Sequence, residues 1–151
     1  MNAPDLRRGP PRRWNESLGQ IRWLPRLIDK TRAAIAGTLG DYLFGQSPTD
    51  RALLRELGLS HREFARIVHD APGDADVLAS LQARSPERVR AARQWSDEIG
   101  RRKALFLFLI DLDDGYLDRR WAILRMPVRL GAAWFVRTLK RVAPSRAAEG
   151  L

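Results

Sequence analysis

The sequence predicts an all-α fold, a small single-domain bundle of short capped helices. Apolar residues recur at helical spacing in several successive segments. Serine or aspartate precedes many of these segments, often with proline next, as is typical of helix N-termini. Glycine and proline then separate one segment from the next. The 151 residues, 44% of them hydrophobic and 30% charged, suit one globular domain.

The first helix is expected over about residues 21–36, before Gly37 and Gly40 end it. The next piece, Asp41 to Phe44, is short and extended in character, so the prediction leaves room for one short β-hairpin near Tyr42. We expect the inward stripes of the helices to form one core. The expected core residues are Leu24, Leu27, Ile28, Ile35, Leu54, Leu57, Phe64 and Leu78.

Four later helices have recognisable starts. The expected caps are Ser47, Ser60 with Glu63 as a capping box, Asp74, and Ser85. An apolar segment over residues 104–112 follows the last of these. Two C-terminal helical pieces are expected over about residues 117–125 and 127–142, because Pro127 disfavours helix in the residue before it.

Composition divides the chain into four parts. Residues 1–18 form an irregular basic arm, and residues 19–114 form the helical domain. Residues 115–143 form a basic amphipathic helical extension. Residues 144–151 are expected to be a disordered tail.

The net charge of +9 raises the question of nucleic-acid binding. However, 24 of the 27 basic residues are arginine, which indicates a coding bias. The positive excess lies in the N-terminal arm and the C-terminal half, and the central body is near neutral. With 8% aromatic residues and no stacking motif, we expect weak contact but no specific nucleic acid.

Several other classes are excluded by what the sequence lacks. It contains no cysteine, which removes disulfides and thiolate chemistry. The longest apolar run, Ala104 to Ile110, is far shorter than the roughly 20 residues that span a bilayer. The N-terminus has no apolar stretch of signal-peptide length. We therefore expect a cytoplasmic protein and no cofactor.

Several short stretches in the first half resemble a known family. They include Asp5-Leu6-Arg7-Arg8, Leu24-Pro25-Arg26-Leu27-Ile28-Asp29-Lys30, Gly40-Asp41-Tyr42, Pro48 with Asp50, and Asp74 before Val77-Leu78. In order and spacing these stretches, over about residues 5–81, resemble domain-of-unknown-function family 5069. Members commonly have cysteine where this chain has Ser47 and arginine where it has Ala52. The resemblance implies a small bacterial helical domain and brings no known activity.

Two clusters that resemble metal sites have ordinary explanations. His61 and His69 would lie roughly 12 Å apart along one helix, too far to share a metal, so we expect surface or capping histidines. The acidic cluster at Asp111, Asp113, Asp114 and Asp118 lacks the glycine and glutamate positions of a calcium loop. We therefore expect a solvated turn that faces nearby arginines, and no metal.

The best candidate for a ligand site is a group of charged residues around the first helix. It consists of Arg26, Asp29, Lys30, Tyr42 and Asp50. Arg26 and Lys30 are four residues apart, so they lie on neighbouring turns of one helix. If Asp50 faces them, the group could bind a small anion. It could alternatively be the charged site of a small enzyme. Ordinary ion pairing between helices is the simpler alternative.

The C-terminal helix is the second candidate surface. Its apolar sector includes Phe135 and its opposite sector is basic, as in helices that lie on anionic membranes. The residues expected at a membrane or partner surface are Arg129, Trp134, Phe135, Arg137, Lys140 and Arg141. Packing of the same sector on the protein's own core is the default interpretation.

The leading functional hypothesis is a non-catalytic interaction or small-ligand-binding module. One alternative is a small enzyme of unknown reaction with a charged site near Arg26, Asp29 and Asp50. Another is a basic protein that associates with a membrane surface or nucleic acid. A protein partner, a homo-oligomer and weak contact with an anionic membrane are all compatible with the sequence.

Overall fold

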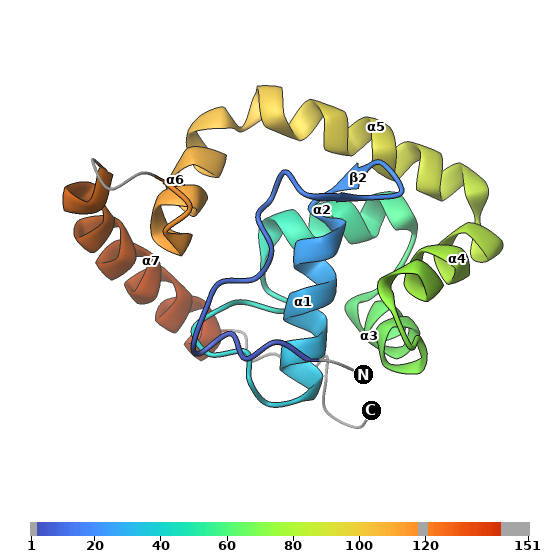
Figure 1. The fold of residues 1–151 in the computed structure, drawn as a ribbon, viewed down its shortest axis with the longest axis horizontal. Coiled ribbons are helices and arrows are strands. Elements are labelled where there is room, and N and C mark those ends of the chain that lie inside the picture. The colour runs from blue at the N-terminus through green and yellow to red at the C-terminus, as the bar shows by residue number, and fades with distance from the viewer. Residues whose placement is uncertain (1–2, 118–120, 143–151) are drawn as a thin grey trace.

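The computed structural model describes residues 3–117 and 121–142; for residues 122, 123 and 139–142 it describes the backbone alone. This part of the chain forms seven helices and one two-stranded hairpin, so the fold is mostly α, as predicted (Figure 1). The elements are β1 (Ser17–Leu18), β2 (Ile21–Arg22), α1 (Leu24–Ile35), α2 (Pro48–Leu57), α3 (His61–Asp70), α4 (Asp74–Arg84), α5 (Pro86–Arg102), α6 (Ala104–Asp114) and α7 (Ala122–Val142). The tail expected over residues 144–151 lies outside the described residues.

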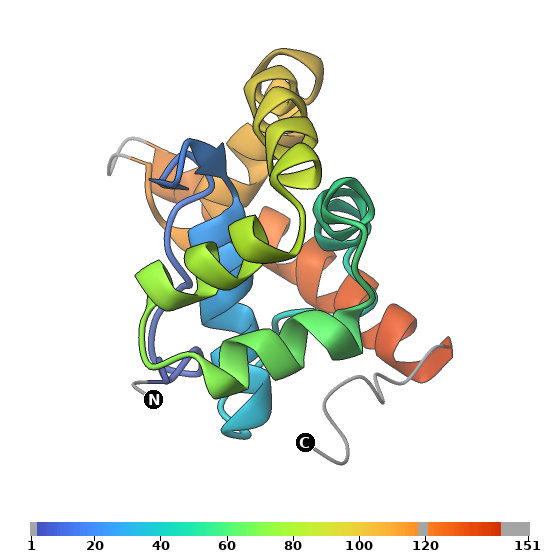
Figure 2. The same ribbon diagram turned by 90° about the vertical axis from the view of Figure 1, so that its right-hand side faces the viewer.

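Helix α1 occupies the centre of the molecule. Helices α3 and α4 lie on one side of it, α6 and α7 lie on the other, and the long α5 passes over one end (Figures 1 and 2). Residues 5–16 run across α1 and form hydrogen bonds to both of its ends, from Leu6 N–H to Thr38 O and from Trp23 N–H to Trp14 O. The arm is therefore irregular but packed.

The hydrophobic core forms around α1. Six of the eight predicted core residues are buried, and Trp23, Phe44 and Leu53 join them. Ile35 and Leu78 are only partly buried, so their assignment to the core is wrong. Ile35 is the last residue of α1. Leu78 packs on the hairpin at Gly19, at the edge of the core.

Three of the four predicted caps are confirmed. The side chains of Ser47, Ser60 and Ser85 each accept a hydrogen bond from the backbone N–H three residues on. The fourth prediction is wrong, because the residue before α4 is Gly73, whose N–H donates to Asp76. Asp74 is the first residue of α4, and its carboxylate instead accepts from two arginines.

We predicted a hairpin near Tyr42, but the hairpin lies at the end of the arm. Strands β1 and β2 pair with Leu18 opposite Ile21, and the two residues between them, Gly19 and Gln20, have φ of 57° and 67°. Two positive φ values define a type I′ turn, which fits the twist of short antiparallel strands. The hairpin takes up Ile21, so α1 begins at Leu24. Tyr42 lies in the irregular segment between α1 and α2.

Helix α7 continues through Pro127, where we predicted a break. A proline inside a helix removes one hydrogen bond and its ring crowds the carbonyl four residues earlier, so Pro127 weakens α7 without ending it. The helix packs against α6. Val128, Ala132 and Val136, from the predicted apolar sector, are half-buried. No helix in the described residues is long and apolar enough to cross a membrane.

Candidate functional site

Helix α1 carries four charged side chains that are nearly closed to solvent. They are Arg26, Asp29, Lys30 and Arg32, each between 3% and 8% exposed. A buried charge is tolerated when an opposite charge compensates it. Each of the four pairs with a residue from another segment, so α1 is joined by ion pairs to the arm, α2, α4 and α6.

The deepest of these pairs joins Lys30 to Asp50. Lys30 Nζ lies 2.7 Å and 2.5 Å from the two carboxylate oxygens of Asp50, which is 0% exposed. The indole N–H of Trp23 donates to the same carboxylate over 2.8 Å. Burial lowers the pKa of the Lys30 ammonium, and Asp50 opposes this effect. The pair is enclosed by the core and fixes the start of α2 against α1.

Arg26 is held between aromatic rings and a carboxylate. Its Nη1 donates to Asp114 Oδ2 over 2.7 Å, and the hydroxyl of Tyr42 donates to the other Asp114 oxygen over 2.8 Å. The guanidinium carbon lies 5.4 Å from the Trp23 ring centre and 5.7 Å from that of Tyr42, within cation–π range. Burial, and then the charge of Asp114, raise the pKa of the Tyr42 hydroxyl, which therefore stays protonated at neutral pH.

A second group of charges fastens the arm to α1 and α4. Arg12 Nη2 lies 2.8 Å from Asp29 Oδ1 and its Nη1 lies 2.6 Å from Asp74 Oδ2. Arg32 Nη1 donates to the other oxygen of Asp74 over 2.6 Å. Burial would raise the pKa of Asp74, but the hydrogen bonds from Arg12 and Arg32 outweigh it and lower this pKa. These residues also line a shallow second pocket of about 460 Å³.

We predicted that the acidic cluster at the end of α6 is a solvated turn, and this prediction is wrong. Asp111 and Asp114 are 4% and 7% exposed. The side chain of Arg13 donates two hydrogen bonds to Asp111, and Trp14 Nε1 donates a third. Ion pairing with arginine is therefore confirmed, but both carboxylates are buried. Asp111 holds α6 against the arm through Arg13, and Asp114 holds it against α1 through Arg26. Asp118 lies outside the described residues.

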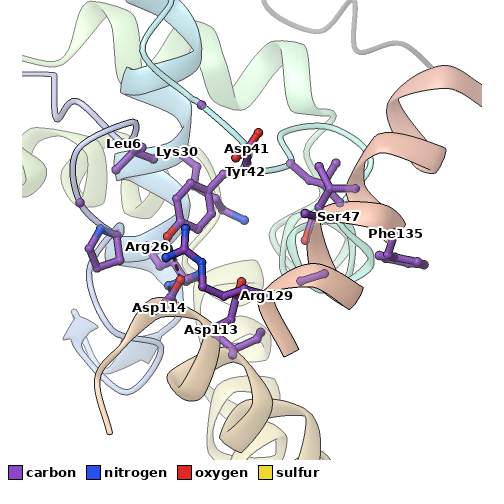
Figure 3. A pocket seen from close by; sticks show the side chains of 18 of the residues that line it. Leu6, Arg26, Lys30, Asp41, Tyr42, Ser47, Asp113, Asp114, Arg129 and Phe135 are labelled. Carbon is purple, nitrogen blue, oxygen red and sulfur yellow. Dashed lines mark hydrogen bonds and ion pairs between the residues drawn. The ribbon is translucent and has the colours of Figure 1, made fainter. Parts of the chain in front are cut away.

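A cleft of about 590 Å³ opens beside Arg26 (Figure 3). The arm, α1, the segment before α2, α6 and α7 all contribute to its walls. Its polar lining includes Arg26, Lys30, Asp113, Asp114, Arg125 and Arg129. Its apolar lining includes Trp23, Phe106, Ile110, Ala132, Phe135 and Val136. The cleft thus combines positive charge with aromatic and aliphatic walls, and its volume lies within the range of small-molecule sites.

Two arginines in this cleft have unused donors. The Nε atoms of Arg26 and Arg125 are buried and have no hydrogen-bond partner among the described residues. Arg129 comes from the next turn of α7 and is exposed. A buried donor without a partner costs about 1–3 kcal/mol, more when it is charged.

Asp113 lines the cleft, and its surroundings raise the pKa of its carboxyl group. Burial is the main cause and repulsion from Asp114 is the next. Arg129, Arg26 and Arg125 act in the opposite direction. Figure 3 shows Arg26 and Arg129 close to the Asp113–Asp114 pair.

The predicted ligand residues do not all meet in one cavity. Arg26, Lys30 and Tyr42 line the cleft, and Asp50 lies buried behind Lys30. Asp29 instead lines the second pocket. An enzyme site that needs Arg26, Asp29 and Asp50 together therefore has no common cavity in the described residues.

The predicted surface residues of α7 divide between its two faces. Arg129 and Phe135 line the cleft. Trp134 and Arg137 are exposed and do not line it. The side chains of Lys140 and Arg141 lie outside the described residues.

The two histidines stand apart from the cleft. His69 is half exposed and pairs with Asp70. His61 packs edge-on against Phe44, and burial lowers the pKa of its imidazole. No group of three or more metal-ligating side chains occurs in the described parts of the chain.

Fold and site together define a mostly helical domain with ion pairs buried around a central helix and a cationic cleft at its side. A family model described as Domain of unknown function (DUF5069) matches residues 8–104, and the chain belongs to this family. The match extends the resemblance of residues 5–81 through α5. Helices α6 and α7 lie almost wholly beyond it, so one wall of the cleft comes from outside the family match. No curated protein matches the chain.

Four important residues of the cleft were missing from the predicted ligand site: Trp23, Asp113, Asp114 and Arg125. Asp113 and Asp114 were noticed as an acidic cluster, but nothing in their spacing indicates a partner in α1. Trp23 precedes Arg26 by three residues, which places their side chains within reach of each other at the start of a helix. That spacing is a local signal by which Trp23 could have been found.

Proposed function

We propose that the protein is a binding module that takes a small organic anion into the cleft beside Arg26. The observation that carries this proposal is that three arginines, Arg26, Arg125 and Arg129, line one cavity, and that Arg129 is exposed there. Guanidinium groups suit carboxylates and phosphates because their planar donors match the geometry of these anions. The arginines that line the cleft are therefore the residues that we assign to anion binding.

The walls of the cleft favour an anion with an apolar part. The rings of Trp23 and Tyr42 lie against the guanidinium of Arg26 at cation–π distance. Phe106, Ile110 and Val136 provide further apolar surface. A ligand with one acidic group and an aromatic or aliphatic body would match both kinds of lining, because the apolar part gains from leaving water.

The geometry favours binding over catalysis. Asp50 is closed to solvent and engaged by Lys30 and Trp23. The raised pKa of Tyr42 keeps its hydroxyl protonated, so it does not serve as a base at neutral pH. Asp114 is already shared by Arg26 and Tyr42. The charged groups therefore hold one another in place.

Phenyl phosphate is a suitable probe because it joins a dianion to one aromatic ring. We expect saturable binding to the full chain by isothermal titration calorimetry, tighter than for inorganic phosphate or for phenol. Arg129→Gln should weaken binding about ten-fold, the effect of losing one hydrogen bond to a charged group. Arg137→Gln is the matched control, since Arg137 is exposed on the same helix but does not line the cleft.

Three results would contradict the proposal. One is no saturable binding of phenyl phosphate at millimolar concentration. Another is equal weakening by the Arg129 and Arg137 variants, which would indicate general charge attraction. The third is phenol binding as tightly as phenyl phosphate, which would leave the arginines without a role.

A further inference from the structure

The large apolar side chains that stand exposed are concentrated in one region of the described structure. All of them lie in α6 and α7, between Leu105 and Phe135. Exposed apolar groups that gather in one place commonly mark an interaction surface. The ligand cleft accounts for Phe106 and Phe135, which line it, but not for the others.

The outer face of α7 carries an apolar ridge made of Met126, Leu130 and Trp134. These residues are four apart, so their side chains lie above one another on one face of the helix. They are 73%, 67% and 70% exposed. None of them lines the cleft, which lies on the side of α7 that carries Arg125 and Arg129. The ridge therefore needs a different explanation from the cleft.

The charge of α7 limits what could cover this ridge. The 21 residues of the helix include Arg125, Arg129, Arg137, Lys140 and Arg141 and no acidic residue. Two copies of the chain that met through α7 would bring like charges together. An anionic surface would instead attract the helix, with about 1 kcal/mol for each basic residue near it.

We propose that α7 docks the protein onto an anionic lipid surface, with the helix lying in the plane of the membrane. Met126, Leu130 and Trp134 would enter the boundary between headgroups and acyl chains, where tryptophan is favoured. The exposed Arg137 would contact the anionic headgroups. The helix lies on the surface rather than across it, because it is not apolar enough to span.

Co-sedimentation of the full chain with vesicles tests this proposal. With equal parts of phosphatidylglycerol and phosphatidylcholine we expect binding, and with phosphatidylcholine alone we expect little. The triple variant Met126→Gln, Leu130→Gln, Trp134→Gln should reduce binding by about ten-fold or more, since the ridge supplies the inserted apolar surface. All three residues are exposed, so the variant should keep the circular dichroism spectrum of the parent.

A matched pair of charge variants tests the electrostatic part. Arg137→Gln should weaken binding to the mixed vesicles about five-fold. Arg101→Gln removes the same charge from an exposed position on α5 and should leave binding unchanged.

The fluorescence of Trp134 gives a second readout. Vesicles should shift the emission of the full chain to shorter wavelength. Trp134→Phe should lose most of this shift while still binding, because phenylalanine keeps the apolar contact. A shift that persists in this variant would overturn the placement of Trp134 in the membrane.

Three further results would overturn the proposal. One is no sedimentation with the mixed vesicles. Another is equal binding to phosphatidylcholine alone, which would remove the role of charge. The third is self-association of the full chain in analytical ultracentrifugation that the triple variant abolishes, which would show that a second copy covers the ridge. Phenyl phosphate binding is measured without vesicles and vesicle binding without phenyl phosphate, so the two proposals fail or succeed separately.

Discussion

Lys30 and Asp50 form an ion pair that is closed to solvent, with Nζ 2.5 Å from Oδ2 and both side chains no more than 4% exposed. Lys30 comes from the middle of α1 and Asp50 from the first turn of α2. The cost of removing both charges from water is large and is offset only while both are present. The pair therefore fixes the relative position of two helices that line or support the cleft.

Loss of one partner should be severe. Asp50→Asn leaves the Lys30 ammonium buried without a counter-charge, and we expect it to lower the free energy of unfolding by about 3–5 kcal/mol. Glu98→Gln is the control, because it breaks the exposed pair with Arg102 and should cost less than about 0.5 kcal/mol. Urea denaturation of both variants measures the difference. Equal costs would show that burial does not decide the strength of these pairs.

Leu27 should be essential to the core. It is 0% exposed in the first turn of α1, so Leu27→Ala should lower the free energy of unfolding by about 2–5 kcal/mol. Ile35→Ala, at the partly exposed end of the same helix, should cost clearly less. A loss below about 0.5 kcal/mol for Leu27→Ala in chemical denaturation would remove this residue from the core.

The same substitution at two glycines should have opposite effects. Gly19 has φ of +57°, and an added Cβ would lie 2.6 Å from Leu78 Cδ2, so Gly19→Ala should destabilise by about 1–3 kcal/mol. Gly131 lies inside α7 with nothing within 4 Å of an added Cβ. Gly131→Ala should therefore raise helix stability by up to about 1 kcal/mol. Thermal melts followed by circular dichroism compare the two, and destabilisation by both would contradict this account of α7.

Asp113 should make stability depend on pH in the acid range. Its pKa in the folded protein is raised above the ordinary value of 3.8, so the folded state holds this proton more tightly than the unfolded state. The contribution of Asp113 to stability is thus greatest below pH 3.8 and falls as the pH rises through the raised pKa. Asp113→Asn removes this dependence, so its stability relative to the parent should improve from acid to neutral pH. If urea titrations show that the stability of Asp113→Asn relative to the parent falls from acid to neutral pH, the attraction of Asp113 to the arginines outweighs the effect of burial.

The local parts of the fold could be predicted because they depend on residues close in sequence. Ser47, Ser60 and Ser85 cap their helices through contacts three residues away, and these caps are confirmed. The hairpin was missed because each strand has only two residues and no alternating pattern. Its turn also uses a positive φ at Gln20, a residue type that gives no such signal.

The site could be predicted only in part, for a similar reason. The spacing of Arg26 and Lys30 indicated a charged ridge on the first helix, and the structure places both in the lining of the cleft. Their partners could not be chosen from the sequence, since Asp114 lies 88 residues from Arg26 along the chain. The residues that α7 adds to the cleft likewise could not be predicted, because their position depends on how α6 and α7 pack beside the arm. Such long-range placement follows from packing of the whole chain and not from any local pattern.

A crystal structure of the full chain with phenyl phosphate tests the central claim most directly. The binding proposal predicts the phosphate group in the cleft, within hydrogen-bond distance of the Arg129 guanidinium, with the phenyl ring against the apolar wall near Phe106 and Val136. A phosphate bound in the second pocket between Arg12 and Arg32, or an empty cleft at a phenyl phosphate concentration that saturates binding in solution, would contradict it.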